Sequence, residues 1–380
     1  MSKLDELIAE LCPDGVEFKE LRQVLRIRNG KDYKHIAEGS IPVYGSGGVI
    51  TYINQFAYDK PSVLIPRKGS IDKLYFVEEP FWTVDTLFYT EINTEIIEPK
   101  FVFYYLQSQR IERLNTAGGV PSLTQTVLNK IPIPLPPKPV QEEIVRILDN
   151  FTELTAELTA ELTARRKQYE YYRDLLLTFG DDVPMMALGD ICTVQSGGTP
   201  SKANHEYWDN GTIKWLGSTV CQNQKTVDEV TNYISELGLK NSSSKLMKKE
   251  TTLIALVGAT IGKVAFLPFE AAINQNIAGI YPIDTSRINP SYVFYACSML
   301  YSDFIGLSQG KLAMANLSFV RGLKIPVPPL KEQERIVAIL DRFDALCNDL
   351  TSGLPAEIEA RQKQYEYYRD KLLSFKEVTA

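Results

Sequence analysis

Residues 166–174 read RKQYEYYRD, and residues 362–370 read QKQYEYYRD. Eight of these nine positions match, at an offset of 196 residues. Upstream, QEEIVRILDNF at 141–151 matches QERIVAILDRF at 333–343, at an offset of 192. Ordered matches of this quality indicate a tandem duplication, and the period is too long for a solenoid.

The matching segments are predicted to be long helices. Between 141 and 179, apolar residues recur at spacings of three and four with one gap. The strings IPLPP at 133–137 and IPVPP at 325–329 precede the two copies, and prolines up to Pro139 should prevent an earlier start of the first helix. About 40 helical residues extend roughly 60 Å. Such a helix is longer than a single globular core and needs a partner helix, for which its repeat is the obvious candidate.

Two perfect tetrads, TAEL at 155–158 and at 159–162, lie inside the first helix. Their leucines stay near one face but drift around it, because four residues turn a helix by about 400°. The change of offset from 192 to 196 places four additional residues in the second copy, where Gly353 and Pro355 occur. The second helix is therefore predicted to break near Ser352, with Pro355 opening a new helix.

Tyrosines in the repeated motif point to two contact surfaces. Tyr169 and Tyr171 are two residues apart and so about 200° apart around the helix, as are Tyr365 and Tyr367. A two-helix pair buries only one side of each helix. The other side meets either a globular domain or another protein, and the sequence leaves both possibilities open.

The composition is that of an ordinary globular protein of two domains. The chain has 380 residues, of which 44% are apolar and 23% charged. Its start carries no basic-then-apolar signal, and apolar runs such as 252–257 are far too short to span a membrane. Five cysteines without a close pair argue against a zinc site or a disulfide framework and fit the reducing cytoplasm, where we expect the protein. The net charge of −6 lacks the basic footprint usual for a DNA-binding protein, so any basic surface must come from local clustering.

The segments ahead of the two helices, 15–132 and 181–324, resemble each other only faintly. In both, short β-branched and aromatic runs alternate with Gly, Pro, Asn and Asp turns, and helical stretches are predicted near 101–114 and 291–305. Each segment is predicted to form a compact α+β domain. A duplicated frame with divergent inserts is expected when the frame performs a shared task and the inserts perform different ones.

In this order of parts, repeated twice over essentially the whole chain, the sequence resembles type I restriction–modification specificity subunits. Ser196-Gly-Gly-Thr-Pro200 at the start of the second domain is also typical of that family, whereas the first domain has Asn29-Gly-Lys31 there. The resemblance implies an α+β fold with two target-recognition domains, separated by two long antiparallel coiled-coil helices. Each domain would read one half of a split double-stranded DNA site. The expected division is an N-terminal helix at 1–14, target-recognition domains at 15–136 and 181–327, a central spacer helix at 137–180 and a C-terminal spacer helix at 328–380.

The resemblance also implies partners. Two methyltransferase subunits would dock on the helices, and restriction subunits would join through them. S-adenosylmethionine, ATP and Mg²⁺ would be used by those partners, with no cofactor or metal bound by this chain. The expected subunit interface comprises Tyr169, Tyr171, Tyr172, Arg173, Tyr365, Tyr367, Tyr368 and Arg369.

Each tetrad adds about 6 Å of helix, against about 3.4 Å per base pair. The number of tetrads is therefore expected to set the preferred gap between the two half-sites, by one or two base pairs for each tetrad.

Both domains contain Gly-rich turns with basic, amide and hydroxyl side chains. Asn and Gln can pair with adenine edges, and Arg or Lys with guanine or phosphate. Any one of these residues could equally be an ordinary surface turn or a hydrogen-bonded core amide, but as sets they favour DNA contact. The predicted contacts of the first domain are Lys31, Lys34, Arg67, Lys68, Ser70, Lys73, Thr83, Asp85, Ser122, Thr124 and Gln125. Those of the second domain are Thr199, Lys202, Thr260, Lys263, Asn274, Gln275, Asn276, Lys311 and Asn316.

No catalytic motif emerges. Residues 258–263 resemble a phosphate-binding loop, but the glycine spacing is one short and Val264 replaces the required Ser or Thr. No NPPY or DPPY string of an adenine methyltransferase occurs, and no His–Cys set offers a metal site, since His35 and His205 are expected to be solvated. The sequence therefore predicts a non-catalytic DNA-binding subunit. Two less favoured alternatives are a nuclease built from scattered acids and a scaffold whose domains bind protein.

Overall fold

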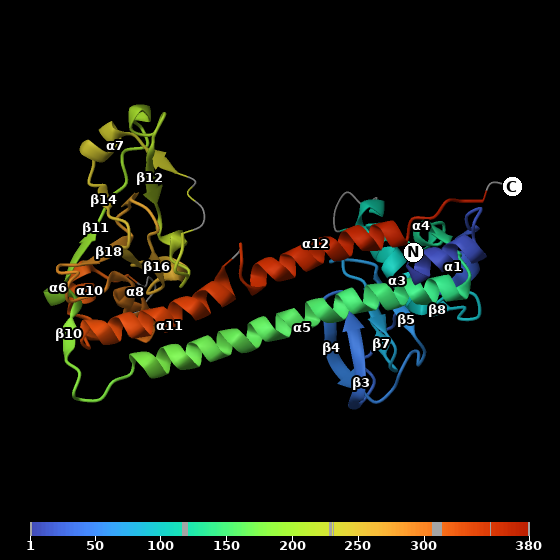
Figure 1. The fold of residues 1–380 in the computed structure, drawn as a ribbon. Coiled ribbons are helices and arrows are strands. Elements are labelled where there is room, and N and C mark those ends of the chain that lie inside the picture. Colours follow the sequence, from blue (N-terminus) through green and yellow to red (C-terminus); the bar gives the residue numbers. More distant parts are fainter. Residues whose placement is uncertain are drawn as a thin grey trace. The chain divides into compact units, whose positions relative to one another are not determined.

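The computed structural model describes residues 2–115, 121–227, 230, 232–305, 314–349 and 351–378. The chain forms two compact units (Figure 1). The first unit comprises Met1–Leu158 and Ile358–Ala380, and the second comprises Thr159–Glu357. The long helix α5 (Lys138–Leu177) contributes its first half to the first unit and its second half to the second.

The first unit is built on an antiparallel four-stranded sheet of order β2-β8-β5-β6. Its strands are β2 (Leu25–Asn29), β8 (Leu87–Ile92), β5 (Ser62–Pro66) and β6 (Tyr75–Val77). In a second sheet, β3 pairs antiparallel with β4 and parallel with β7. The strands of that sheet are β3 (Glu38–Gly45), β4 (Gly48–Ile53) and β7 (Trp82–Thr83). The ladder of β1 (Phe18–Glu20) with β9 (Pro132–Pro134) and the helices α1 (Lys3–Leu11), α2 (Leu21–Val24), α3 (Pro99–Ser108), η1 (Ile111–Leu114) and α4 (Gln125–Leu128) complete the unit.

The second unit repeats this plan. Its main sheet has the order β11-β18-β15-β16, and in its second sheet β12 pairs parallel with β17, as β3 does with β7. The strands of the main sheet are β11 (Cys192–Ser196), β18 (Ile277–Pro282), β15 (Thr252–Ala255) and β16 (Val264–Phe266). Those of the second sheet are β13 (Tyr233–Ile234), β12 (Ile213–Leu216), β17 (Ala271–Ile273) and β14 (Lys245–Met247). The remaining elements are β10 (Met185–Ala187), β19 (Lys324–Pro326), α6 (Leu188–Ile191), α7 (Glu236–Lys240), α8 (Pro290–Ser298), α9 (Tyr301–Ile305), α10 (Leu317–Gly322), η2 (His205–Tyr207), η3 (Ser218–Val220) and η4 (Gly258–Thr260).

One helix covers the main sheet in each unit. In the first unit α3 packs against β5, whose five residues are all buried, and Phe101 and Leu106 of α3 are fully buried. In the second unit α8 packs against β15, and Tyr292 and Tyr295 are fully buried. The apolar runs of β5 and β15 are thus central strands covered on both faces, as a short continuous apolar run predicts. The predicted α+β fold is confirmed for both units.

The predicted break in the second long helix is confirmed. The segment consists of α11 (Leu330–Asn348) and α12 (Leu354–Leu372), and Pro355 lies in the first turn of α12. The predicted start of the first helix at 141 was wrong, since α5 begins at Lys138 and contains Pro139. Proline is tolerated there because the N–H groups of the first helical turn make no hydrogen bond within the helix, so the N–H that proline lacks is not needed.

The helices pack through one aromatic contact that occurs twice. In the second unit, Tyr172 of α5 stacks on Phe343 of α11, with ring centroids 5.6 Å apart and planes at 26°. In the first unit, Phe151 of α5 stacks on Tyr368 of α12, at 5.5 Å and 22°. The two phenylalanines are repeat equivalents, as are the two tyrosines, so the contact recurs with the roles of the helices exchanged.

A buried glutamine fixes the first turn of each long helix to its domain. The Gln141 side chain is fully buried and accepts a hydrogen bond from the backbone N–H of Glu98 (2.7 Å). Its amide donates to the carbonyl oxygens of Ile96 (3.1 Å) and Pro136 (2.7 Å). The side-chain oxygen of Gln141 thus has a donor, and its amide nitrogen donates to carbonyl groups of two separate segments.

Gln333 makes the same three contacts in the second unit. It accepts from the backbone N–H of Asn289 (2.9 Å) and donates to the carbonyls of Arg287 (3.0 Å) and Pro328 (2.8 Å). A tyrosine–aspartate hydrogen bond about two helical turns further along adds a second connection between each helix and its domain. Tyr104 donates to Asp149 (2.5 Å) in the first unit, and its counterpart in the second unit is the bond from Tyr295 to Asp341 (2.6 Å).

The two ends of the chain meet in the first unit. The backbone N–H of Val16 donates to the carbonyl of Lys376 (2.9 Å), and that of Val378 donates to the carbonyl of Val16 (3.1 Å). The α1 helix docks on α5 through an ion pair between Lys3 and Glu143 (2.9 Å), and Leu4 is buried in the core.

We expect Gln141→Ala to lower the free energy of unfolding of the first unit by about 2 to 4 kcal/mol, because three buried backbone groups lose their partners. Hydrogen exchange of the peptide that spans residues 94–100, followed by mass spectrometry, measures the effect. Glu142→Ala is the control, since the neighbouring Glu142 is exposed. Equal protection in the two variants would contradict this role of Gln141.

Candidate nucleic-acid interface

In the first unit, separate loops meet at one end of the main sheet. The end of β2 pairs beside the start of β8 (Asn29 with Phe88), and the end of β5 does so too (Pro66 with Leu87). The loops that leave these strand ends therefore emerge together. They are residues 29–34, 45–48, 66–70 and 83–86, joined by 121–125, and are called here the first loop surface.

Backbone hydrogen bonds connect these loops. The N–H of Lys31 donates to the carbonyl of Thr83 (2.8 Å), and that of Arg67 donates to the carbonyl of Thr86 (2.8 Å). The N–H of Leu123 donates to the carbonyl of Arg67 (2.9 Å). The predicted contact residues of the first domain are dispersed from Lys31 to Gln125 in sequence, and all of them except Lys73 thus belong to the loops of one surface.

Most of the predicted residues are accessible on this surface. Those exposed are Lys31, Lys34, Lys68, Ser70, Asp85 and Thr124, and those half-buried are Arg67, Ser122 and Gln125. Lys73 is exposed but follows loop 66–70 and is not part of the surface. Some also have structural roles: Thr124 caps α4 by accepting from the N–H of Val127 (3.3 Å), and Gln125 donates to Asn29 (3.2 Å).

Thr83 is an exception. It is fully buried because β7 lies in the second sheet beside β3, where Thr83 pairs with Tyr44. Among the described residues its hydroxyl has no hydrogen-bond partner. The structure therefore opposes the prediction of a direct DNA contact by this side chain.

The second unit has an equivalent second loop surface at the same end of its main sheet. It is defined by residues 197–199, 216–222, 256–263, 274–276 and 314–316. Its connecting bonds run from the N–H of Gly197 to Asn274 (3.2 Å), from that of Leu256 to Asn276 (2.9 Å) and from that of Ala315 to Leu256 (2.9 Å), with a carbonyl as acceptor each time.

Most of the predicted residues of the second domain gather there too, whereas Lys202 follows loop 197–199 and is not part of it. Lys202, Gln275 and Asn316 are exposed, whereas Thr199, Thr260, Lys263 and Asn276 are half-buried. The Thr199 hydroxyl donates to Gln275 (2.8 Å), and Lys263 donates to Gln222 (3.2 Å).

Two of the predicted asparagines in the second domain have structural roles, and one predicted lysine is not described. Asn274 is only 8% exposed, and its side chain accepts from the N–H of Asn276 (2.9 Å), so it shapes the turn and the structure opposes a direct contact. Asn316 caps α10 by accepting from the N–H of Phe319 (2.8 Å), as its repeat equivalent Thr124 caps α4. Lys311 lies outside the described residues.

Sequence reasoning missed two features. The indole of Trp82 donates to the carbonyl of Lys31 (2.9 Å), and that of Trp215 to the carbonyl of Gly198 (3.1 Å), so a tryptophan fixes the equivalent loop in each unit. The second feature is the exposed amide run Gln222-Asn223-Gln224, which Asn223 anchors to β16 by accepting from the N–H of Val264 (3.0 Å). Three consecutive amides are a signal that could have identified this loop.

Two equivalent glycines allow the loops to approach each other. A Cβ atom on Gly30 would lie 2.0 Å from the carbonyl oxygen of Val84, and one on Gly197 would lie 1.8 Å from that of Ile273. Both distances are far inside van der Waals contact, so only glycine fits. These glycines fix the geometry of both loop surfaces.

The tyrosines of the repeated helix motif face two directions, as predicted. Tyr171 and Tyr367 are 64% and 62% exposed, and each lies edge-on to the next tyrosine, Tyr172 or Tyr368, at 5.4 and 5.3 Å. By contrast, Tyr365 donates to Gln107 of its own unit (2.9 Å).

The remaining predicted interface residues are engaged within their units. Tyr169 packs against Phe343, at 6.4 Å between ring centroids. Arg173 and Arg369 are bound to the adjacent Asp174 and Asp370. The exposed aromatic surface is therefore formed by Tyr171 and Tyr367, each together with the neighbouring tyrosine, Tyr172 or Tyr368, which keeps one part exposed while it stacks within its unit. The pairs Tyr171 with Tyr172 and Tyr367 with Tyr368 are called here the tyrosine faces.

Among the described residues, no group of three or more His, Cys, Asp or Glu side chains could hold a metal ion. All five cysteines are buried, and burial raises the pKa of the Cys192 and Cys221 thiols to about 12. These thiols are therefore protonated and inaccessible at neutral pH.

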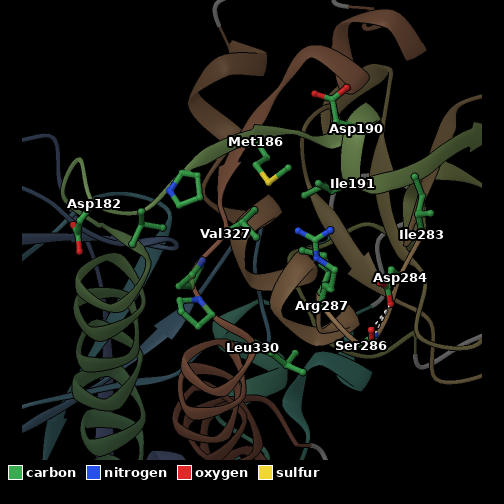
Figure 2. Close-up of a pocket in the computed structure, with 15 residues that line it drawn as sticks. Asp182, Met186, Asp190, Ile191, Ile283, Asp284, Ser286, Arg287, Val327 and Leu330 are labelled. Carbon is green, nitrogen blue, oxygen red and sulfur yellow. Dashed lines mark hydrogen bonds between the residues drawn. The ribbon is translucent and has the colours of Figure 1, made fainter.

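A pocket of about 670 Å³ in the second unit lies away from the loop surface (Figure 2). It opens beside Ile191 and Ile283, where β11 begins and β18 ends, whereas the loops follow the opposite ends of these strands. Met186, Val327 and Leu330 give it an apolar lining. The pocket is thus at the opposite end of the main sheet from the second loop surface.

Comparison with known proteins gives a consistent result. The family model described as type I restriction modification DNA specificity domain matches residues 13–165 and 180–360. The specificity subunit of a type I restriction enzyme from Escherichia coli is 41% identical over 288 residues, which cover 73% of this chain and 70% of that protein. A putative type I specificity subunit of Haemophilus influenzae is 33% identical over 95% of this chain and 96% of its own length. The chain therefore belongs to the family of type I restriction–modification specificity subunits.

Solved structures show the same fold. The crystal structure of the type I restriction–modification S subunit from M. genitalium aligns with 94% of this chain and 96% of its own, with a TM-score of 0.63 and 17% identity. A chain from a study of assembly of the type I system aligns with 96% of this chain and 98% of its own, with a TM-score of 0.59 and 17% identity. Within the described part of the chain, no helix is both long and apolar enough to cross a membrane.

We expect Gly197→Ala to destabilise the second unit by about 2 to 4 kcal/mol, because its methyl group would displace the β17 carbonyl of Ile273. Urea unfolding of the full chain measures the change. Gly322→Ala serves as the control, since a Cβ there meets nothing within 4 Å. Unchanged stability of the Gly197 variant would show that the loop can move apart without loss.

Proposed function

We propose that this chain is the non-catalytic DNA-specificity subunit of a type I restriction–modification complex and that it recognises a bipartite double-stranded DNA target. One observation carries the proposal: the same loop surface is built twice, at the same end of equivalent sheets, but with different side chains. Recognition of a DNA target with two unlike half-sites requires two such surfaces, with the same backbone arrangement but different side chains.

The side chains of the loop surfaces have the chemistry for this task. Lysine and arginine side chains such as Lys31, Arg67 and Lys68 suit phosphates and guanine edges, and amides such as Gln275 suit adenine edges. The loops come from rigid strand ends and are cross-linked by backbone hydrogen bonds. Readout therefore needs little ordering of the protein on binding, which favours affinity.

Methyltransferase subunits are the proposed partners of the tyrosine faces. Exposed tyrosine pairs are typical of protein interfaces because a large apolar ring is combined with a hydroxyl group. Two equivalent faces would dock two methyltransferase subunits, and restriction subunits would join through these in the cytoplasm. S-adenosylmethionine, ATP and Mg²⁺ would then be bound by the partners, which would perform the chemistry.

Methylation mapping of host DNA tests the proposal. A host that expresses this chain with its neighbouring methyltransferase subunit should carry methylation at a split motif with a fixed gap. The same host without this chain should lack that motif. Identical methylation in both hosts would exclude the role in DNA specificity.

We expect Tyr171→Ala to reduce the number of bound methyltransferase subunits from two to one, and Tyr171→Ala with Tyr367→Ala to abolish binding. Loss of a central aromatic side chain weakens an interface by about 2 kcal/mol or more, about 30-fold. Co-purification with mass determination reads out the stoichiometry. Tyr233→Ala is the control, because this tyrosine is 41% exposed but lies on β13. Two subunits bound to the double variant would remove the tyrosine faces from the proposal.

A further inference from the structure

The β3–β4 hairpin of the first unit carries an apolar surface that the unit itself does not cover. Val49, Ile50 and Tyr52 of β4 are 46%, 55% and 53% exposed. In the order β4-β3-β7, β4 is an edge strand. Proteins usually protect such edges with charges or prolines, because an exposed apolar edge promotes aggregation. An unprotected edge of this kind points to a surface that a binding partner covers.

A β-bulge sets the direction of one of these side chains. Val43 pairs with Thr51 and Tyr44 pairs with Val49, so Ile50 has no partner residue in the ladder. Bulges re-aim side chains and are frequent beside functional sites. Ile50 reaches across Gly45, where an added Cβ would lie 3.2 Å from its Cδ1 atom.

The same Cβ position lies 3.6 Å from the Val84 side chain. Val84 belongs to loop 83–86 of the first loop surface. The bulge thus holds Ile50 at the edge of the proposed DNA-binding surface.

The turn of the hairpin consists only of residues with small side chains or none. It reads Gly45-Ser46-Gly47-Gly48, and the φ of +114° at Gly48 requires glycine. Gly47 has no such constraint, since its φ is not in the left-handed region and a Cβ there would meet nothing within 4 Å. The fold does not need glycine at position 47, whereas close approach of the backbone to a ligand would.

Cations lie beside this turn. The hydroxyl of Tyr75 donates to the carbonyl of Ser46 (3.0 Å), and a Cβ on Gly69 would lie 3.3 Å from the Ser46 hydroxyl. The turn is therefore adjacent to loop 66–70, which carries Arg67 and Lys68. In the view of Figure 1, β3 and β4 extend below α5.

We propose that the turn of the β3–β4 hairpin enters a groove of the DNA and that Val49 and Ile50 contact base edges there. This inference rests on the proposed function. A two-stranded ribbon fits the major groove, and apolar side chains recognise the methyl group of thymine. The adjacent cations suit the phosphates that border the groove. Apolar recognition beside cations favours DNA over a protein partner as the occupant of this edge.

The second unit lacks an equivalent apolar ribbon within its described residues, since β13, the counterpart of β4, spans only Tyr233–Ile234. A change in the hairpin should therefore affect one half-site of the DNA target and leave the other unchanged. This asymmetry provides an internal control.

Ile50→Thr tests the proposal, because threonine keeps the β-branch but replaces an apolar group by a hydroxyl. Methylation mapping in a host with the partner subunits should show that one position of one half-site becomes relaxed, with methylation at altered sites raised about ten-fold. Ile283→Thr, at a residue 65% exposed beside the pocket of Figure 2, should leave both half-sites unchanged.

Gly47→Leu tests entry into the groove itself. It should lower methylation at the wild-type motif at least about ten-fold, because the added side chain widens a turn that must fit between phosphates. Gly322→Leu is the matched control, since both glycines have open space around them. Thermal unfolding of each variant verifies that the fold is intact.

The outcomes separate the two proposals. Absence of any split motif with the wild-type chain would overturn the proposed function. A normal split motif that neither hairpin variant alters would overturn the hairpin proposal alone. Loss of methylation at every site, together with loss of co-purified methyltransferase, would assign the hairpin to a protein interface and would also overturn it.

Discussion

The orientation of each long helix relative to its own domain depends on the side chain of one glutamine at the start of that helix. Gln141 and Gln333 are buried, and each joins three backbone groups from two segments that would otherwise be unsatisfied inside the protein. A buried amide with three partners has little freedom, so it fixes the direction in which the helix leaves its domain. The tyrosine–aspartate bonds and the stacked aromatic pairs further along the helices depend on that direction. The repeated motif is thus a device for orientation as well as for helix pairing.

Much of the fold follows from the sequence, and the reason is visible in particular elements. The helix break at Gly353 and Pro355 was predictable because these residues act locally. The buried strands β5 and β15 were readable as apolar runs. The start of α5 was not, because Pro139 is tolerated only where a helix begins, and the sequence alone does not locate that point.

The candidate site was predictable as a set of loops but not as a surface. Lys31, Arg67 and Gln125 carry suitable chemistry in the sequence, yet only strand pairing brings them together. Thr83 and Asn274 show the limit of reading by residue type, because a hydroxyl or an amide serves equally inside a turn. The apolar hairpin was overlooked because its significance lies in the edge position of β4 and in the bulge at Ile50, which are properties of pairing.

The backbone bonds between Val16 and the segment 376–378 have a consequence for synthesis of the protein. The second unit is continuous in sequence, from Thr159 to Glu357, whereas the first needs both ends of the chain. Domains generally fold as units as the ribosome releases them. The first unit is therefore synthesised first but completed last. It lacks α12 and the segment 376–378 until the second unit has been synthesised.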